Sequence, residues 1–262
     1  MSRRSLARAA AAALLVALAA GGCSRAVKAP PAAPAADAEE VLAALRARTA
    51  SVRSFHSTGT VYLRTNREKH FLHFEAWFER PSRSRLVIDL PGFLGLGSGR
   101  LTVVRSGDRI AFLRPGSEEV EHASLADTSL APLSVFGLAP ADAVYLVAPH
   151  AGPEDLYRTE NVVAFAAARN EGFLRLVLRR EDGLREVLRI ASPSFALAER
   201  RVVEPEGTVH FASSYRYEAE EEAFAREVET YLPREEMRLT ARFQAAEQNV
   251  AVADSVFRLA ED

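Results

Sequence analysis

The sequence predicts a mainly β protein with a few helices, an α+β fold, built on one large, curved antiparallel sheet. About a dozen segments alternate apolar and polar residues with a period of two, and Gly-containing turns separate several of them. Only three segments have helical spacing. The chain has 262 residues, of which 48% are hydrophobic and 26% charged, a composition that excludes disordered, collagen-like and polytopic membrane proteins.

The first segment, residues 1–22, has the organisation of a signal peptide. Arg3, Arg4 and Arg8 form a basic start, and residues 9–20 form an apolar stretch. That stretch is too short for a permanent membrane span, which needs about 20 residues. Without these three arginines, 30 basic and 35 acidic residues remain, a net charge of −5. Such a balance does not favour nucleic-acid binding.

The single cysteine, Cys23, follows the sequence Leu18-Ala19-Ala20-Gly21-Gly22. One cysteine excludes an intramolecular disulfide and a metal cluster held by cysteines. Small residues directly before a cysteine resemble the lipobox of bacterial lipoproteins, although Ala20 stands where that pattern prefers Leu. The resemblance implies cleavage before Cys23 and attachment of palmitate-type acyl chains, a stable membrane anchor. Ser24, in place of the Asp that retains lipoproteins in the inner membrane, implies the outer membrane.

Two alternatives stay open for this segment. An ordinary secreted protein could carry a cysteine near its cleavage site by chance. Residues 2–6 also resemble a twin-arginine signal, so the sequence does not decide between that export route and the general secretory one.

Residues 23–36, the lipidated cysteine and an Ala- and Pro-rich stretch, are predicted to form a semi-rigid tether. A single domain over residues 37–262 follows. It opens with a helix over residues 37–52, because Asp37 and Glu40 have capping-box spacing and an apolar stripe follows at helical spacing.

Strands are predicted on both sides of a short helical region. The helical region covers residues 128–138 and 140–147, with Pro140 at a first-turn position. The predicted strands cover residues 55–64, 70–79, 84–90, 100–106, 109–114, 161–168, 172–180, 184–191, 197–203, 208–217, 227–232 and 237–245.

One face of these strands is apolar and the other is rich in arginine, which indicates an antiparallel sheet with one wet side. Because a sheet this long tends to curl, and the helices are too few to fill it, we expect an apolar cavity. Its predicted lining consists of Val61, Leu63, Leu72, Phe74, Phe78, Leu174, Leu176, Leu178, Leu239 and Phe243.

Residues 90–99 join two predicted strands and contain four glycines and a proline. The connection nevertheless carries Phe93, Leu94 and Leu96, large apolar residues that a loop tip does not ordinarily expose. They either fold back to cap the core or contact a bilayer or an apolar partner. An anchored protein favours contact with the membrane.

The sequence shows no recognisable set of catalytic residues. Of the six histidines, His70 and His73 lie three apart on a predicted strand and therefore point to opposite faces. No metal-ligand motif occurs, the glycines of residues 95–99 precede a strand rather than a helix, and no nucleophile has a recognisable base. We therefore predict no enzyme activity, no metal and no cofactor.

The order of lipobox, tether, helix, strands, two mid-chain helices and further strands resembles the LolA/LolB superfamily of lipoprotein-binding proteins, and the LolB branch most. Residues 93–98 are similar in place and chemistry to an apolar loop of LolB. Residues 130–138 and the closing stretch 254–259 are also similar to superfamily segments.

The resemblance implies a half-barrel of about 11 strands, closed by the N-terminal helix and short mid-chain helices over an acyl-chain cavity. It implies an anchored monomer on the periplasmic face of the outer membrane. That monomer would accept acylated lipoprotein cargo from a soluble LolA-like donor and insert it into outer-membrane lipid, with Leu94 or Leu96 in the loop's delivering role. A carrier of another lipid, a structural lipoprotein with a filled interior and an anchored hydrolase are the alternatives.

Overall fold

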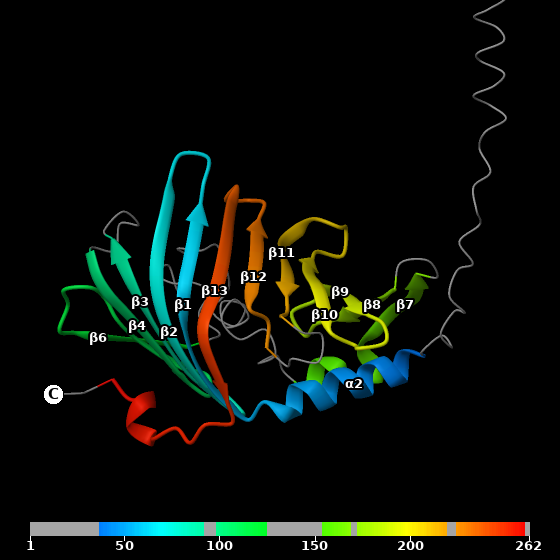
Figure 1. The fold of residues 1–262 in the computed structure, drawn as a ribbon, viewed down its shortest axis with the longest axis horizontal. Coiled ribbons are helices and arrows are strands. Elements are labelled where there is room, and N and C mark those ends of the chain that lie inside the picture. Colours follow the sequence, from blue (N-terminus) through cyan, green and yellow to red (C-terminus); the bar gives the residue numbers. More distant parts are fainter. Residues whose placement is uncertain (1–36, 92–97, 125–153, 169–171, 219–223, 260–262) are drawn as a thin grey trace, which may run out of the picture. The chain divides into compact units, whose positions relative to one another are not determined.

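The computed structural model describes residues 37–91, 98–124, 154–168, 172–218 and 224–259 (Figure 1). The chain divides into two compact units, Met1–Pro34 and Ala35–Asp262, and all described residues belong to the second. None of the helices in these ranges combines the length and the apolar character that crossing a membrane requires.

Thirteen antiparallel strands form one sheet in the order β6-β5-β4-β3-β2-β1-β13-β12-β11-β10-β9-β8-β7 (Figure 1). The sheet curves but does not close into a barrel: β6 and β7 are its two edge strands, and they do not pair with each other. The strands are β1 Ser54–Arg64, β2 Lys69–Glu79, β3 Arg83–Pro91, β4 Ser98–Ser106, β5 Arg109–Leu113, β6 Val120–Ser124, β7 Val162–Ala168, β8 Phe173–Arg179, β9 Arg185–Ala191, β10 Leu197–Val203, β11 Val209–Arg216, β12 Glu227–Leu232 and β13 Met237–Gln248.

The helix α2, Ala38–Ser51, begins where the sequence predicts it. The carboxylate of Asp37 accepts a hydrogen bond from the backbone N–H of Glu40 at 2.7 Å, which satisfies one of the free donors of the first turn. Val41, Leu42 and Leu45 are buried in the same cluster as the strand side chains. We call the sheet face that contributes to this cluster the inner face, and the opposite one the outer face.

Two short 3-10 helices, η2 (Glu154–Tyr157) and η3 (Thr159–Asn161), lie beside α2. Arg46 donates to the backbone oxygen of Tyr157 at 3.0 Å, and Thr159 donates to Glu39 at 2.5 Å. These bonds fasten the segment before β7 to the N-terminal helix.

The central ladder joins the first strand to the last, since β1 pairs with β13 over ten residue pairs. Its register shifts between Thr58 and Gly59. A Cβ atom at Gly59 would lie 2.2 Å from the backbone oxygen of Arg242 and 2.8 Å from the Phe74 ring. Only glycine therefore permits this close approach of β1 and β13.

A third 3-10 helix, η4 (Asp254–Phe257), packs against β3 and β4. Arg83 forms an ion pair with Asp254 at 2.6 Å, and its guanidinium carbon lies 4.8 Å from the centroid of the Phe257 ring. Arg85 donates to the backbone oxygen of Val256 at 3.0 Å. Arg83 and Arg85 alternate with the core residues of β3, so the C-terminal segment lies on the outer face.

The predicted mainly β fold with one curved antiparallel sheet is confirmed, with thirteen strands rather than about 11. Twelve of them match predicted segments, and β13 extends three residues past the predicted end at 245. The sequence prediction missed β6, in which His122 and Glu121 interrupt the apolar pattern and which, among the described strands, pairs with β5 alone. The predicted helices over 128–138 and 140–147 lie outside the described residues.

Candidate functional site

All ten residues predicted to line a cavity point to the inner face. They come from β1, β2, β8 and β13, and each is at most 9% exposed. The structure brings them into one continuous apolar cluster, together with the buried side chains of α2. That these side chains bind a ligand stays a prediction.

Aromatic rings contribute much of this cluster. Phe74 and Phe243 meet edge to face with centroids 5.6 Å apart, and Phe224 meets Phe243 in the same way at 4.9 Å. Phe55 stacks on Phe78 at 5.4 Å. Sequence reasoning did not select Phe55 and Phe224. Phe55 shares the strand parity of Val61 and could have been found, whereas Phe224 precedes β12 and shows no periodic signal.

The inner face also holds a buried polar group that sequence reasoning missed. Arg200 of β10 and Glu186 of β9 form an ion pair at 2.5 Å, and their side chains are only 3% and 2% exposed. Arg180 lies 3.6 Å from the same carboxylate. Ser213 and Thr230 share a buried hydrogen bond of 2.7 Å on the neighbouring strands. Since Arg200 has the parity of the buried Val202, the alternation in β10 could have placed it inward.

The outer face presents aromatic residues near the β1–β2 turn. Phe71 is 72% exposed and lies directly opposite Tyr62, with ring centroids 4.8 Å apart. Further from this turn on the same two strands, the His56 ring stacks on Trp77 with centroids 4.8 Å apart, and its Nε2 lies 2.9 Å from the carboxylate of Glu75.

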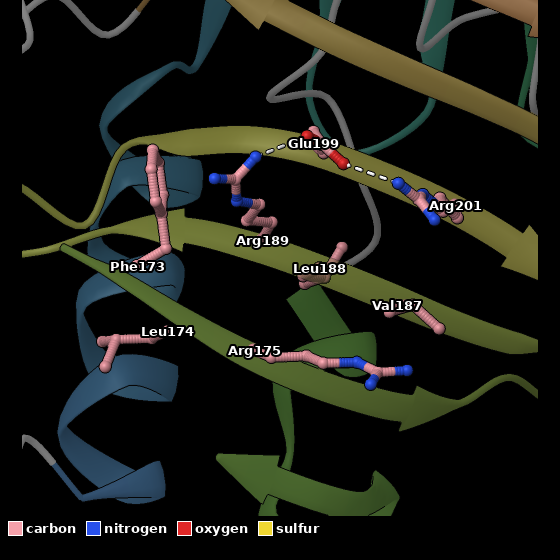
Figure 2. Close-up of a pocket in the computed structure, with 8 residues that line it drawn as sticks. All are labelled: Phe173, Leu174, Arg175, Val187, Leu188, Arg189, Glu199 and Arg201. Carbon is pink, nitrogen blue, oxygen red and sulfur yellow. Dashed lines mark hydrogen bonds and ion pairs between the residues drawn. The ribbon is translucent and has the colours of Figure 1, made fainter. Parts of the chain in front are cut away.

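A pocket of about 320 Å³ lies over β8, β9 and β10 (Figure 2). Its polar lining residues alternate with the buried residues of these strands and so belong to the outer face. Glu199 accepts hydrogen bonds from Arg189 at 2.7 Å and Arg201 at 3.0 Å. Partial burial of Glu199 raises its pKa, but these bonds outweigh burial and leave the pKa below its usual range.

A second pocket, of about 560 Å³, lies between the C-terminal segment and the outer face of β4, β5 and β6. Phe257, Arg258 and Leu259 form one wall, and Val104, Ala111 and His122 are among the opposite residues.

The predicted membrane-contacting residues Phe93, Leu94 and Leu96 lie outside the described residues, as does the predicted lipidation site Cys23. The strands on both sides of the loop are described. Pro91 pairs with Ser98, so residues 92–97 are a six-residue connection between neighbouring antiparallel strands. In the described ranges, no group of three His, Cys, Asp or Glu side chains is arranged to hold a metal ion.

No family model and no curated protein matches the sequence. Solved structures match the fold. A LolA superfamily protein from Nitrosomonas europaea aligns with a TM-score of 0.60 at 12% identity, over 86% of this chain and 99% of that one. The chain has the LolA-like fold.

Two further structures support the LolA-like fold. A putative outer membrane lipoprotein-sorting protein domain from Vibrio parahaemolyticus aligns with a TM-score of 0.64 at 12% identity, covering 84% of this chain and 97% of that one. A DUF1329 family protein from Desulfovibrio piger aligns with a TM-score of 0.59 at 10% identity, covering 84% and 95%. At such low identities the likeness is one of fold.

Proposed function

We propose that this chain is an outer-membrane lipoprotein that binds acyl chains at the inner face of its LolA-like sheet. It receives acylated lipoproteins from a soluble LolA-like donor and passes them to the outer membrane, as LolB does. The fold and the name of the lipoprotein-sorting domain that shares it support lipid or lipoprotein binding in general. The steps at the outer membrane rest on the sequence and on the arrangement of this chain.

The observation that carries the proposal is the continuous apolar inner face. Leu63, Leu72 and Leu239 from three adjacent central strands and Leu176 from β8 belong to one cluster. An antiparallel sheet this wide, whose inner face is apolar apart from a few buried polar groups on β9 to β12, supplies the kind of surface that a long acyl chain requires. Burial of each methylene stabilises the bound chain by about 0.8 kcal/mol.

The end of the sheet at which β1 and β3 finish suits contact with a bilayer. The β1–β2 turn and the pair Pro91–Ser98, which flanks residues 92–97, lie at the same end of their strands, because β1 and β3 run in the same direction and each is followed by its antiparallel neighbour. The exposed Phe71 and its partner Tyr62 lie near that end of the sheet, with Arg64 and Lys69 beside them. Aromatic and basic side chains together favour the membrane interface.

Transfer along this route needs neither ATP nor a metal if each site binds acyl chains better than the one before. Full burial of Phe93, Leu94 and Leu96 in lipid would contribute about 1.5–3 kcal/mol each. That amount suits reversible contact during delivery, while the acylated Cys23 provides the permanent anchor.

The first test is native mass spectrometry of the mature chain with Cys23→Ala, purified from a periplasmic extract without detergent. We expect adducts that contain acylated peptide or whole lipoprotein. Adducts of phospholipid or fatty acid alone would favour a general lipid carrier. A bare mass, with no fatty acid taken up on titration, would contradict acyl-chain binding.

The second test concerns delivery. The double variant Leu94→Glu and Leu96→Glu should fold normally and bind cargo, yet fail to insert it into outer-membrane vesicles, because two carboxylates cannot enter the bilayer cheaply. Val163→Glu is the matched control, since Val163 is 40% exposed on the end strand β7. Normal delivery by the double variant would contradict the assignment of the loop.

A structural lipoprotein with a filled interior is the second candidate. The near-complete burial of the inner-face side chains favours it, because the same burial would follow if the chain's own residues fill the interior. Displacement of a hydrophobic dye by fatty acid separates the two candidates, since a filled interior takes up neither.

A further inference from the structure

The hairpin of β1 and β2 projects from one end of the sheet. The two strands pair with each other as far as Arg64 and Lys69, whereas β2 pairs with β3 only from Phe74 onward. Residues 69–73 of β2 therefore lie beyond the ladder that β2 shares with β3, and the hairpin stands out at this end (Figure 1).

Hydrogen bonds hold the tip of this hairpin in one conformation. The backbone N–H of Thr65 donates to the backbone oxygen of Glu68 at 2.9 Å. The N–H groups of Arg67 and Glu68 donate to the Thr65 hydroxyl at 3.2 and 3.0 Å. The Asn66 amide donates to the carboxylate of Glu236 on the neighbouring β12–β13 turn. A binding surface at this tip is thus formed in advance.

Aromatic rings lie on the outer face of the hairpin next to the tip. Among the described residues Phe71 is the most exposed large apolar side chain, at 72%, followed by Tyr231 at 41%. The Tyr62 ring packs against Phe71 from the opposite strand. On the inner face of the same hairpin Leu63 and Leu72 are each only 1% exposed, so Phe71 is not required to complete the core.

Basic side chains lie between these rings and the turn. Arg64 and Lys69 stand directly opposite each other on the outer face, and Arg67 lies in the turn; all three are exposed. Like charges in opposite positions repel each other, and neither Arg64 nor Lys69 forms an ion pair with a described residue. The hairpin tip has one carboxylate, that of Glu68. The neighbouring turn, residues 233–236, adds one basic and two acidic residues, so the two turns together keep a net charge of +1.

This combination of side chains identifies the class of partner. Aromatic rings favour the interface between headgroups and acyl chains, and basic residues beside them attract anionic headgroups. A nucleic acid also binds aromatic and basic side chains, but it requires a basic groove along its backbone. The net charge of −2 for the whole chain disfavours that partner.

We propose that the tip of the β1–β2 hairpin binds the surface of a bilayer that contains anionic phospholipid. Phe71 and Tyr62 enter the interface, and the three basic residues contact the headgroups. The proposal rests on the proposed membrane function and extends it to a second contact, which depends neither on the acylated cysteine nor on residues 92–97. It also orients the sheet, because this end of the strands then faces the bilayer.

The first test is co-sedimentation of the chain with Cys23→Ala, using vesicles of phosphatidylcholine with and without phosphatidylglycerol. We expect binding to the anionic vesicles to be at least about fivefold tighter and to weaken as salt is added. Arg64→Gln with Lys69→Gln should weaken binding to the anionic vesicles about tenfold. Arg175→Gln with Arg179→Gln is the matched control, because it removes the same two charges from exposed positions on β8 and should leave binding unchanged.

The second test measures insertion. Trp77 is the single tryptophan, and it lies six residues, about 20 Å, from Phe71 along β2, away from the tip. Phe71→Trp should therefore add fluorescence that brominated phospholipid quenches, whereas Trp77 of the unmodified chain should not be quenched. Phe71→Ser should weaken binding to both kinds of vesicle about tenfold. Val163→Ser, at an exposed apolar position on β7, should bind as the unmodified chain does.

Fatty-acid uptake by Phe71→Ser should be unchanged, so a failure of this proposal is distinguishable from a failure of acyl-chain binding at the inner face. The proposal is wrong if the chain binds neither kind of vesicle, or if the hairpin variants bind as tightly as their controls. It is equally wrong if bound Phe71→Trp is not quenched, or if the tip binds a single-stranded oligonucleotide in preference to the vesicles.

Discussion

Glu186 and Arg200 form an ion pair inside an otherwise apolar cluster. Their side chains are 2% and 3% exposed, and the guanidinium carbon of Arg200 lies 5.7 Å from the centroid of the Phe211 ring. Both charges have lost most of their hydration, so Arg200 and Glu186 compensate each other, with Arg180 as a second, more distant guanidinium 3.6 Å from the same carboxylate. At the residue scale, we therefore expect the inner face to be sensitive to substitution at this pair.

Removal of one partner should therefore cost more than removal of both. Arg200→Met should lower the free energy of unfolding by up to about 3–5 kcal/mol, because it removes the nearer of the two guanidinium groups beside a buried carboxylate. The double variant Glu186→Leu and Arg200→Met should be markedly more stable than the single one. Urea denaturation measures both, and Arg201→Met, on the outer face, is the control. A double variant as unstable as the sum of the single changes would contradict this account.

At the scale of elements, the central ladder depends on the glycine at its irregular position. Gly59→Ala places a methyl group against the backbone oxygen of Arg242 and the Phe74 ring. A backbone atom in a ladder cannot move away without breaking hydrogen bonds, which costs free energy. We expect a loss of about 1–3 kcal/mol or more in unfolding free energy. Thr60→Ala, one residue further along β1, should cost less. Equal denaturation midpoints for the two variants would show that the register shift relaxes freely.

The attachment of η4 is a second element-scale prediction. The Arg83 guanidinium bonds Asp254 and holds the pKa of its carboxyl below the usual range. Because this pKa is lowered on folding, the contribution of Asp254 is present above the pKa of the unfolded chain, about 3.9, and is lost as the pH falls through the folded value.

Asp254→Asn should therefore speed amide exchange of Val256 and Arg258, whose N–H groups bond within the segment, at pH 6–7. At a pH below both pKa values the variant and the unmodified chain should exchange alike, because both side chains are then neutral. Hydrogen exchange followed by mass spectrometry measures the difference at each pH. A difference that persists unchanged in acid would assign the effect to something other than the ion pair.

Local periodicity explains why most elements could be predicted from the sequence. Segments such as Phe173–Arg179 alternate strictly, and their bounds agree within a residue or two. The strand β6 has two charged or ionisable residues in five and rests on a single neighbour, so its local signal is too weak. The pairing of β1 with β13 joins residues about 180 positions apart, which no short-range pattern contains.

The candidate site, too, could be predicted from the sequence only in part. The inward orientation of the ten apolar residues follows from strand parity, and all ten are buried in one cluster. The pair of Glu186 and Arg200 has the inward parity, but the irregular start of β10 weakened that signal. The pocket around Glu199 unites side chains from three strands, and its composition depends on register as well as on parity.

At the scale of the whole molecule, the β1–β13 ladder holds two halves of the chain together. Residues 37–124 supply β1 to β6, and residues 154–259 supply β7 to β13. A specific protease site introduced between residues 125 and 153 should give, after cleavage, two fragments that stay associated on size-exclusion chromatography. The reason is that the ladder and the common core remain intact.

The cleaved form should also unfold at a lower urea concentration than the uncut chain, and its midpoint should rise with protein concentration, since unfolding then releases two molecules. The uncut chain should show no such dependence. Fragments that separate in native buffer would contradict the central role of this ladder.

The position of β1 between β2 and β13 also has a mechanical consequence. The helix α2 leads directly into this strand (Figure 1), and the predicted anchor, Cys23, precedes α2 in the sequence. If the predicted anchor holds the chain, a pull that reaches β1 through α2 meets a strand that is paired on both sides, with β2 and with β13. Had the tether entered at an end strand such as β7, the same force could peel one ladder open bond by bond. If Cys23 carries the predicted anchor, the attachment point precedes a strand that is paired on both sides rather than an end strand.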